Sequence, residues 1–219
     1  MPTITIDDVE YEVAEGRMLL QAIDDLGLLL NGIDVPHYCW HPKLPIDGSC
    51  RLCQVEIEGL PKLQIACNTP VRDGMVVRTR GERIDAARRG VMELLLINHP
   101  LDCPICDQAG ECKLQDYAFE YGLKHARTED PRRPAKKSQR LGPTIVFDQE
   151  RCILCRRCVR FCREIPKSGE LGVFQRGDES LLELFPGSQL DNPYSMNVAD
   201  ICPVGALTTE DFQIGRAHV

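Results

Sequence analysis

Eleven of the twelve cysteines in this 219-residue chain, together with one histidine, are spaced as three separate groups of metal ligands. The groups are Cys39, Cys50, Cys53 and Cys67; His99, Cys103, Cys106 and Cys112; and Cys152, Cys155, Cys158 and Cys202. Thiolates, with an occasional imidazole, are the ligands that hold iron–sulfur clusters in proteins. Three clusters in so short a chain would let electrons step from one to the next, so we expect an electron-transfer protein.

The first group has the spacing C-x10-C-x2-C-x13-C. A long loop followed by a C-x2-C corner can wrap a [2Fe–2S] cluster, although this loop is longer than the one in plant-type ferredoxins. Four cysteines also form structural zinc sites, and the neighbouring residues His37, Tyr38, Trp40 and Arg51 leave both metals possible. The strands predicted on either side of the group favour [2Fe–2S].

The second group has the spacing H-x3-C-x2-C-x5-C within the segment NHPLDCPICDQAGEC. A lone histidine is more often a core or surface residue, and three cysteines with one histidine are a familiar zinc set. Because this group lies between two predicted cluster domains, we expect it to hold a [4Fe–4S] cluster with His99 as one ligand. A neutral imidazole makes a cluster less negative than a thiolate does, which by charge alone would raise its reduction potential.

The third group begins with the run RCILCRRCVRFC, which is the strongest motif in the chain. Its short loops let three thiolates reach three corners of a [4Fe–4S] cluster, and the distant Cys202, followed by Pro203, supplies the fourth. In two-cluster ferredoxins the last cysteine of such a run binds the other cluster. Here Cys162 has no following proline and no second run to join, so we expect a free, buried cysteine.

Five arginines surround the third group, namely Arg151, Arg156, Arg157, Arg160 and Arg163. A [4Fe–4S] cluster with four thiolate ligands is negatively charged, so cationic neighbours would stabilise its reduced form and raise its reduction potential. A solvated basic face or a docking patch explains the same residues equally well.

The composition argues against several classes of protein. A net charge of −7 argues against a nucleic-acid-binding protein, and no apolar stretch approaches the roughly 18 residues that span a bilayer. The N-terminal sequence MPTITIDDVEYEV lacks the basic and apolar regions of a secretory signal. We therefore expect metal ligands rather than the disulfides of an exported protein.

The apolar pattern of the first third of the chain predicts two strands, a helix, a cysteine-bearing loop and three further strands. These elements are expected at residues 3–6, 11–13, 17–26, 54–58, 63–66 and 75–79. Their order is typical of a ubiquitin-like β-grasp, the fold of plant-type [2Fe–2S] ferredoxins.

Later elements are fewer. A helix is predicted at residues 82–98, and the residues expected on its apolar face are Ile84, Ala87, Val91, Leu94 and Leu95. A second helix is predicted at residues 113–121, a strand at 144–147 and a helical turn at 197–202.

These patterns predict an α+β protein with four segments. They are a β-grasp [2Fe–2S] ferredoxin domain at residues 1–80, a His/Cys3 [4Fe–4S]-binding segment at 81–125, a linker at 126–140 and a ferredoxin-like [4Fe–4S] domain at 141–219.

The motifs PHYCWHPKL, GSCRLCQVEIEG, NHPLDCPICDQAGECKLQD, RCILCRRCVRF and ICPVGALT resemble those of one known family. This family is the large iron–sulfur subunit of NADH:quinone oxidoreductase (respiratory complex I, where bacteria call it the G subunit), in its N-terminal region. The resemblance covers essentially the whole chain. It implies one [2Fe–2S] cluster on the first group and one [4Fe–4S] cluster on each of the other two.

The resemblance also implies partners and a place in a reaction. A flavin-bearing subunit would oxidise NADH, and electrons would pass through this chain and other peripheral-arm subunits toward quinone. The chain has no G-x-G-x-x-G or P-loop motif, in keeping with nicotinamide and flavin sites on a partner. We expect a component of an NADH dehydrogenase (quinone) without catalytic residues of its own, held on the cytoplasmic face of the inner membrane by its complex.

Two features depart from the family pattern. Cys162 is not among the family's ligands, and the chain ends at Val219, where members commonly continue into a large molybdopterin-enzyme-like domain. The diaphorase iron–sulfur subunit of NAD-linked hydrogenases has similar motifs in a short chain and is the first alternative. A zinc-binding scaffold without redox function is the second.

Overall fold

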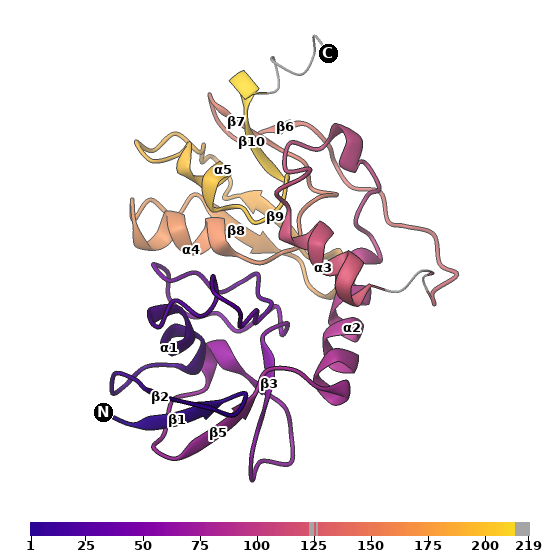
Figure 1. The fold of residues 1–219 in the computed structure, drawn as a ribbon. Coiled ribbons are helices and arrows are strands. Elements are labelled where there is room, and N and C mark those ends of the chain that lie inside the picture. Colours follow the sequence, from indigo (N-terminus) through magenta and orange to yellow (C-terminus); the bar gives the residue numbers. More distant parts are fainter. Residues whose placement is uncertain (123–124, 126, 213–219) are drawn as a thin grey trace. The chain divides into compact units, whose positions relative to one another are not determined.

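The computed structural model describes residues 1–122, 125 and 127–212. The chain forms two compact units. The first contains residues 1–94 with Tyr121 and Gly122, and the second contains residues 95–120, 125 and 127–212. Figure 1 labels the helices and strands of both. None of the helices in these described ranges is long and apolar enough to cross a membrane.

A five-stranded sheet forms the first unit. Its strands are β1 Thr3–Ile6, β2 Val9–Glu12, β3 Gln54–Ile57, β4 Gln64–Ile65 and β5 Met75–Arg78. They lie in the order β2-β1-β5-β3-β4, with β1 parallel to β5 and the other neighbouring pairs antiparallel. With helix α1 (Leu19–Asp25), this arrangement confirms the predicted β-grasp, and the ends of its elements differ from prediction by two residues at most.

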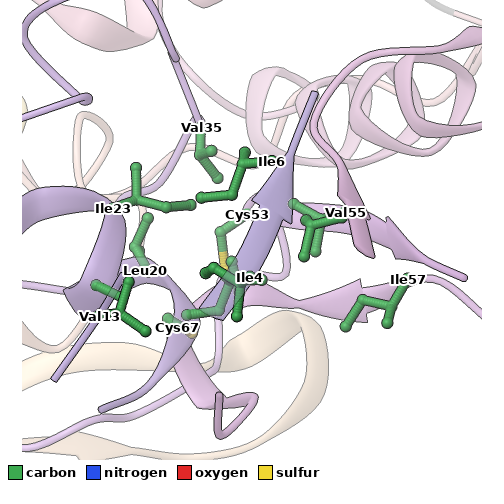
Figure 2. Close-up of a cluster of buried hydrophobic side chains, with 14 of the residues drawn as sticks. Ile4, Ile6, Val13, Leu20, Ile23, Val35, Cys53, Val55, Ile57 and Cys67 are labelled. Carbon is green, nitrogen blue, oxygen red and sulfur yellow. The ribbon is translucent and has the colours of Figure 1, made fainter. Parts of the chain in front are cut away.

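The core of this unit explains why its strands and helix form as they do. Alternation along β1 buries Ile4 and Ile6, and α1 buries Leu20 and Ile23. Each such side chain contributes about 1.5–3 kcal/mol by leaving water. Figure 2 shows Cys53 and Cys67 among these aliphatic side chains; the buried members are Ile4, Ile6, Val13, Leu19, Leu20, Ala22, Ile23, Val35, Trp40, Cys53, Val55, Ile57, Ala66, Cys67 and Val77. The core that stabilises the fold therefore includes two predicted ligands.

Helix α2 (Glu82–Leu96) confirms the predicted helix, but its predicted apolar face is wrong in part. Leu94 is 72% exposed, whereas Arg88 is completely buried. The Arg88 guanidinium donates hydrogen bonds to the Tyr121 hydroxyl at 3.1 Å and to the Gln54 carbonyl at 2.9 Å. A charged side chain can occupy the core when its donors are satisfied in this way, and hydrophobic periodicity does not reveal it.

The second unit contains a three-stranded sheet, a hairpin and short helices. Its elements are η2 Cys103–Ile105, α3 Lys113–Tyr121 (up to Glu120), β6 Gln139–Arg140, β7 Ile145–Phe147, α4 Arg157–Glu164, β8 Leu171–Phe174, η3 Gly177–Glu179, β9 Leu181–Leu184, α5 Asn197–Ile201 and β10 Leu207–Thr209. The sheet has the antiparallel order β10-β7-β6, and β8 pairs with β9.

Prediction and structure agree on α3, β7 and α5, whereas α4, the hairpin and β10 are not predicted. The eight residues of α4 are mostly charged or cysteine, so they carry little apolar signal. Strand β6 forms at the end of the segment predicted to be a linker.

Candidate metal centres

The first ligand group comes from loops and element ends of the β-grasp unit. Cys39 and Cys50 lie in the loop after α1, Cys53 immediately precedes β3, and Cys67 lies in the short helix η1 (Ala66–Asn68). The side chain of Cys39 forms hydrogen bonds with Cys50 and Cys67. Cys53 forms one with Cys67. The structure therefore brings all four predicted thiols together.

Shared protons determine the charge of these four thiols. Hydrogen bonds from Cys50 and Cys67 lower the pKa of Cys39, and a hydrogen bond from Cys67 lowers the pKa of Cys53. The pKa values of Cys50 and Cys67 are raised, first by these hydrogen bonds and then by burial. Four thiolates could be buried together only with a compensating cation. The donor set therefore fits an iron–sulfur cluster.

The turns inside the C-x2-C segments share a backbone feature that sequence reasoning missed. Arg51, Leu154 and Arg156 have positive φ angles of 57°, 52° and 59°. The left-handed conformation costs a non-glycine residue about 1–2 kcal/mol, and turns of this kind point successive N–H groups toward one centre. The Leu154 N–H donates to the Cys152 sulfur at 3.4 Å. Non-glycine residues carry no sequence signal for this conformation.

The second group surrounds η2 and the start of α3. Electrostatic interactions of Cys112 with Cys103 and Cys106 place these three thiols near one another. The His99 Nδ1 atom is enclosed without a hydrogen-bond partner, and burial lowers the pKa of His99, so its imidazole is neutral at pH 7. A neutral, unsatisfied ring nitrogen suits a metal ligand. Within the described ranges, no three His, Cys, Asp or Glu side chains are arranged to hold a single metal ion.

Gly205 makes the closest approach between the chain segments of the second and third groups. A Cβ atom built on Gly205 would lie 2.4 Å from the Cys106 sulfur, closer than real Cβ atoms come to any neighbour. Only glycine allows this approach. Gly205 is three residues beyond Cys202, so it brings the end of the third group against a ligand of the second. Nothing in the sequence distinguishes this glycine from one in an ordinary turn.

All four cysteines of the third group line one pocket, whose empty space out to its opening is about 390 Å³. Cys158 lies on α4, and Cys202 follows α5 directly. Apolar side chains including Phe147, Val173 and Leu182 form much of the remaining wall. The pocket thus offers four sulfur donors within an apolar enclosure, which is the environment a [4Fe–4S] cluster requires.

Burial is the main influence on the thiols of this pocket. It raises the pKa of Cys155 to about 12, and it also raises the pKa values of Cys152, Cys158 and Cys202. Backbone N–H groups act in the opposite direction, as Leu154 does on Cys152. Because the buried thiols resist ionisation, they become thiolates only with a bound cation, and the donor set fits a cluster.

The five arginines predicted around the third group do not act as one set. The charges of Arg157 and Arg160 lower the pKa of Cys155, and the buried Arg160 donates to the Cys155 carbonyl at 3.4 Å. Arg163 is instead exposed and pairs with a neighbouring carboxylate at 2.7 Å. Arg151 is directed toward the second group. The prediction is therefore wrong for Arg151 and Arg163.

Cys162 is completely buried, as expected for a spare cysteine. It lies one helical turn after Cys158 on α4, and its thiol forms a hydrogen bond with Glu170. Burial, followed by the negative charge of Glu170, raises the pKa of Cys162 to about 12. The thiol is therefore protonated at neutral pH.

Three family models match consecutive parts of the chain. Residues 1–82 match a 2Fe-2S iron-sulfur cluster binding domain. Residues 88–127 match the NADH-ubiquinone oxidoreductase-G iron-sulfur binding region, and residues 142–208 match the ferredoxin-like domain of NADH-quinone oxidoreductase subunit 3. The chain thus carries both 2Fe-2S and 4Fe-4S binding domains, in the predicted order.

Curated relatives carry related names. The NADH-quinone oxidoreductase G subunit of Rickettsia bellii is 44% identical over 97% of this chain, which spans 30% of that protein. The mitochondrial NADH-ubiquinone oxidoreductase 78 kDa subunit of Neurospora crassa is 44% identical over 95% of the chain, which spans 28% of it. The chain therefore spans less than a third of these relatives.

A solved structure has a similar fold. It is a chain of an NAD+-reducing [NiFe]-hydrogenase in the H2-reduced state, with a TM-score of 0.82 and 33% sequence identity. The similarity covers 95% of this chain and 87% of the hydrogenase chain.

Proposed function

We propose, because the chain belongs to the iron–sulfur family of NADH-quinone oxidoreductase G subunits, that it transfers electrons within an NADH:quinone oxidoreductase. In this proposal a flavin-bearing partner subunit oxidises NADH. The chain receives the electrons and passes them, with other peripheral-arm subunits, toward quinone. Its own residues hold the electron carriers, and the NADH site belongs to the partner.

We assign three clusters to the three ligand groups. The first group would hold [2Fe–2S] through Cys39, Cys50, Cys53 and Cys67. The second would hold [4Fe–4S] through His99, Cys103, Cys106 and Cys112, and the third would hold [4Fe–4S] through Cys152, Cys155, Cys158 and Cys202. Cys162 is left out of all three groups because its thiol interacts with Glu170 instead.

When bound, iron–sulfur clusters supply one-electron transfer over a wide range of reduction potentials. The residues of this chain set the surroundings of each cluster. Aliphatic side chains around Cys53 and Cys67 exclude water from the first group. At the third group, backbone N–H groups donate to sulfur, and Arg157 and Arg160 supply positive charge. Both effects stabilise a negatively charged cluster.

The observation that carries this proposal is the convergence of four thiols, separated by up to 50 residues in the sequence, on one apolar pocket. A thiol in an apolar wall is unfavourable as a thiolate, so four together are explained by a bound multinuclear cation. The family models supply the type of cluster, and the named relatives supply the reaction.

Metal content tests the assignment directly. Protein purified without air should contain about ten irons with matching acid-labile sulfide and give low-temperature EPR signals of three clusters once reduced. Cys158→Ser should lose about four irons, whereas the matched variant Cys162→Ser should keep them all. Zinc near one equivalent or more per chain without acid-labile sulfide would contradict the proposal and support a zinc scaffold.

A separate variant tests the histidine ligand. His99→Cys should retain the second cluster because a thiolate replaces the imidazole, but its EPR signal should change with the ligand. An unchanged spectrum would show that His99 does not ligate the cluster.

Activity and location are tested in the whole complex. Membranes from cells with Cys158→Ser should lose NADH-driven quinone reduction, whereas membranes with Cys162→Ser should keep it. We expect the chain to sediment with membranes through its partners, on the cytoplasmic face. Protease accessibility in inverted and right-side-out vesicles checks this placement.

The structural similarity to the NAD+-reducing [NiFe]-hydrogenase chain supports a second candidate, an electron carrier for a hydrogenase. Hydrogen-driven NAD+ reduction in cell extracts separates the two. Loss of that activity in Cys158→Ser, with quinone reduction retained, would favour the hydrogenase. Neighbouring genes for membrane quinone-reductase subunits or for a nickel–iron subunit provide an independent check.

A further inference from the structure

Arg151 is a buried cation whose position differs from the one its sequence neighbours imply. It directly precedes Cys152 of the third group, yet its guanidinium donates to Asp102 through Nη2 at 2.9 Å and Nε at 3.2 Å. Its Nη1 donates to the Gly205 carbonyl at 3.4 Å. Only 8% of Arg151 is exposed. Because three of its donor atoms are engaged, the guanidinium is held in one orientation.

The anchors of Arg151 belong to the surroundings of the second group. Asp102 is the residue before Cys103, and Gly205 lies against the Cys106 sulfur. The charge of Arg151 interacts with Cys106 and with His99, lowering the pKa of the histidine together with its burial. The principal electrostatic influences on the third-group thiols come instead from one another and from Arg157 and Arg160.

A network of charges extends from this pair to the surface. The half-exposed Lys137 lies 3.1 Å from Asp102, 3.4 Å from Asp148 and 2.9 Å from Glu150. Arg151 also lies 3.4 Å from Asp148. Two cations therefore face three carboxylates, and Arg151 is the less exposed of the two cations. Its field is the less screened by water, so it acts more strongly on a neighbouring buried group.

We propose that Arg151 sets the reduction potential of the cluster held by His99, Cys103, Cys106 and Cys112, and that Asp102 both orients Arg151 and limits its effect. This inference rests on the proposed function, since it concerns a bound cluster. Reduction adds one negative charge, which a nearby fixed cation stabilises and a nearby carboxylate opposes. A unit charge acting over about 10 Å at an effective dielectric constant of about 20 changes an equilibrium constant roughly tenfold.

Two substitutions should therefore shift this potential in opposite directions. Arg151→Gln should lower the midpoint potential of the second cluster by about 59 mV, a tenfold change for one electron. Asp102→Asn should raise it by a similar amount, because Arg151 keeps its charge and its second carboxylate, Asp148. The third cluster should shift less in both variants. Arg163→Gln, which removes an exposed arginine of the same unit, is the matched control and should shift neither potential.

The assay is an EPR-monitored redox titration of the purified full chain, preceded by iron and sulfide analysis. Unaltered protein without a second [4Fe–4S] signal would overturn both this inference and the proposed function. With the cluster present, shifts of the same sign in Arg151→Gln and Asp102→Asn, or no shift in either, would overturn the inference alone. Should Arg151→Gln lose the cluster, the sign in Asp102→Asn decides, and Arg151→Lys should restore a potential near that of the unaltered protein.

Discussion

The contact between Gly205 and Cys106 provides the sharpest quantitative test of the second centre. Gly205→Ala would place a Cβ 2.4 Å from the Cys106 sulfur, whereas ordinary contacts begin at 3.4 Å. The two atoms must therefore separate by about 1 Å, the difference between these distances. The backbone of Gly205 does not have the positive φ that would itself disfavour alanine. The effect is therefore steric, and overpacking of this kind costs about 1–3 kcal/mol.

Relaxation can come from only two directions. Cys106 would have to leave its position as a ligand, or the segment after Cys202 would have to move outward. Since a bound cluster fixes Cys106, we expect Gly205→Ala to weaken retention of the second cluster. Iron should fall from about ten toward about six atoms per chain, with the EPR signal of the histidine-ligated centre lost first.

Iron and sulfide analysis, EPR and thermal unfolding together measure this effect. Gly90→Ala is the matched control, because Gly90 lies within α2 and a Cβ there meets nothing within 4 Å. Alanine in a helix interior is favoured over glycine by about 0.5–1 kcal/mol, so this control should be slightly stabilised and keep its full iron. Full iron content and unchanged stability in Gly205→Ala would refute the steric reasoning.

Three further predictions concern other buried groups. Arg88→Ala should destabilise the β-grasp unit by about 2–4 kcal/mol in urea unfolding, because it removes charged hydrogen bonds to Tyr121 and Gln54 and leaves a cavity; a change under 1 kcal/mol would contradict this. Burial opposes ionisation of Glu170, but hydrogen bonds from a nearby hydroxyl and amide outweigh it and lower its pKa. Its contribution to stability should be complete above about pH 4.5 and lost as the pH falls through the lower folded-state pKa; urea midpoints should show a weaker acid dependence in Glu170→Gln, and identical pH profiles would count against it. Cys162, buried and with its pKa raised to about 12 by burial and Glu170, should resist alkylation at pH 8 until the protein unfolds, and rapid labelling of the native protein by mass spectrometry would exclude this.

Short-range patterns in the sequence predict much of this protein. The spacing of cysteines within C-x2-C segments indicates metal ligands because a few intervening residues confine two sulfurs to one small volume. Alternation in residues 3–6 and 75–79 predicts strands because side chains on a strand face opposite sides in turn. The order of these elements then predicts the β-grasp, which the topology confirms.

Tertiary structure alone decides what lies around each ligand group. Arg151 is adjacent in sequence to the third group but contacts Asp102, which is 49 residues away. Gly205 meets Cys106 across 99 residues, and Arg88 occupies a core position through a hydroxyl on another helix. Sequence spacing reports local geometry, whereas the direction of a long charged side chain depends on partners supplied by distant segments. The ligand spacing follows from the chain itself, but the charges acting on each group come from how the chain is packed.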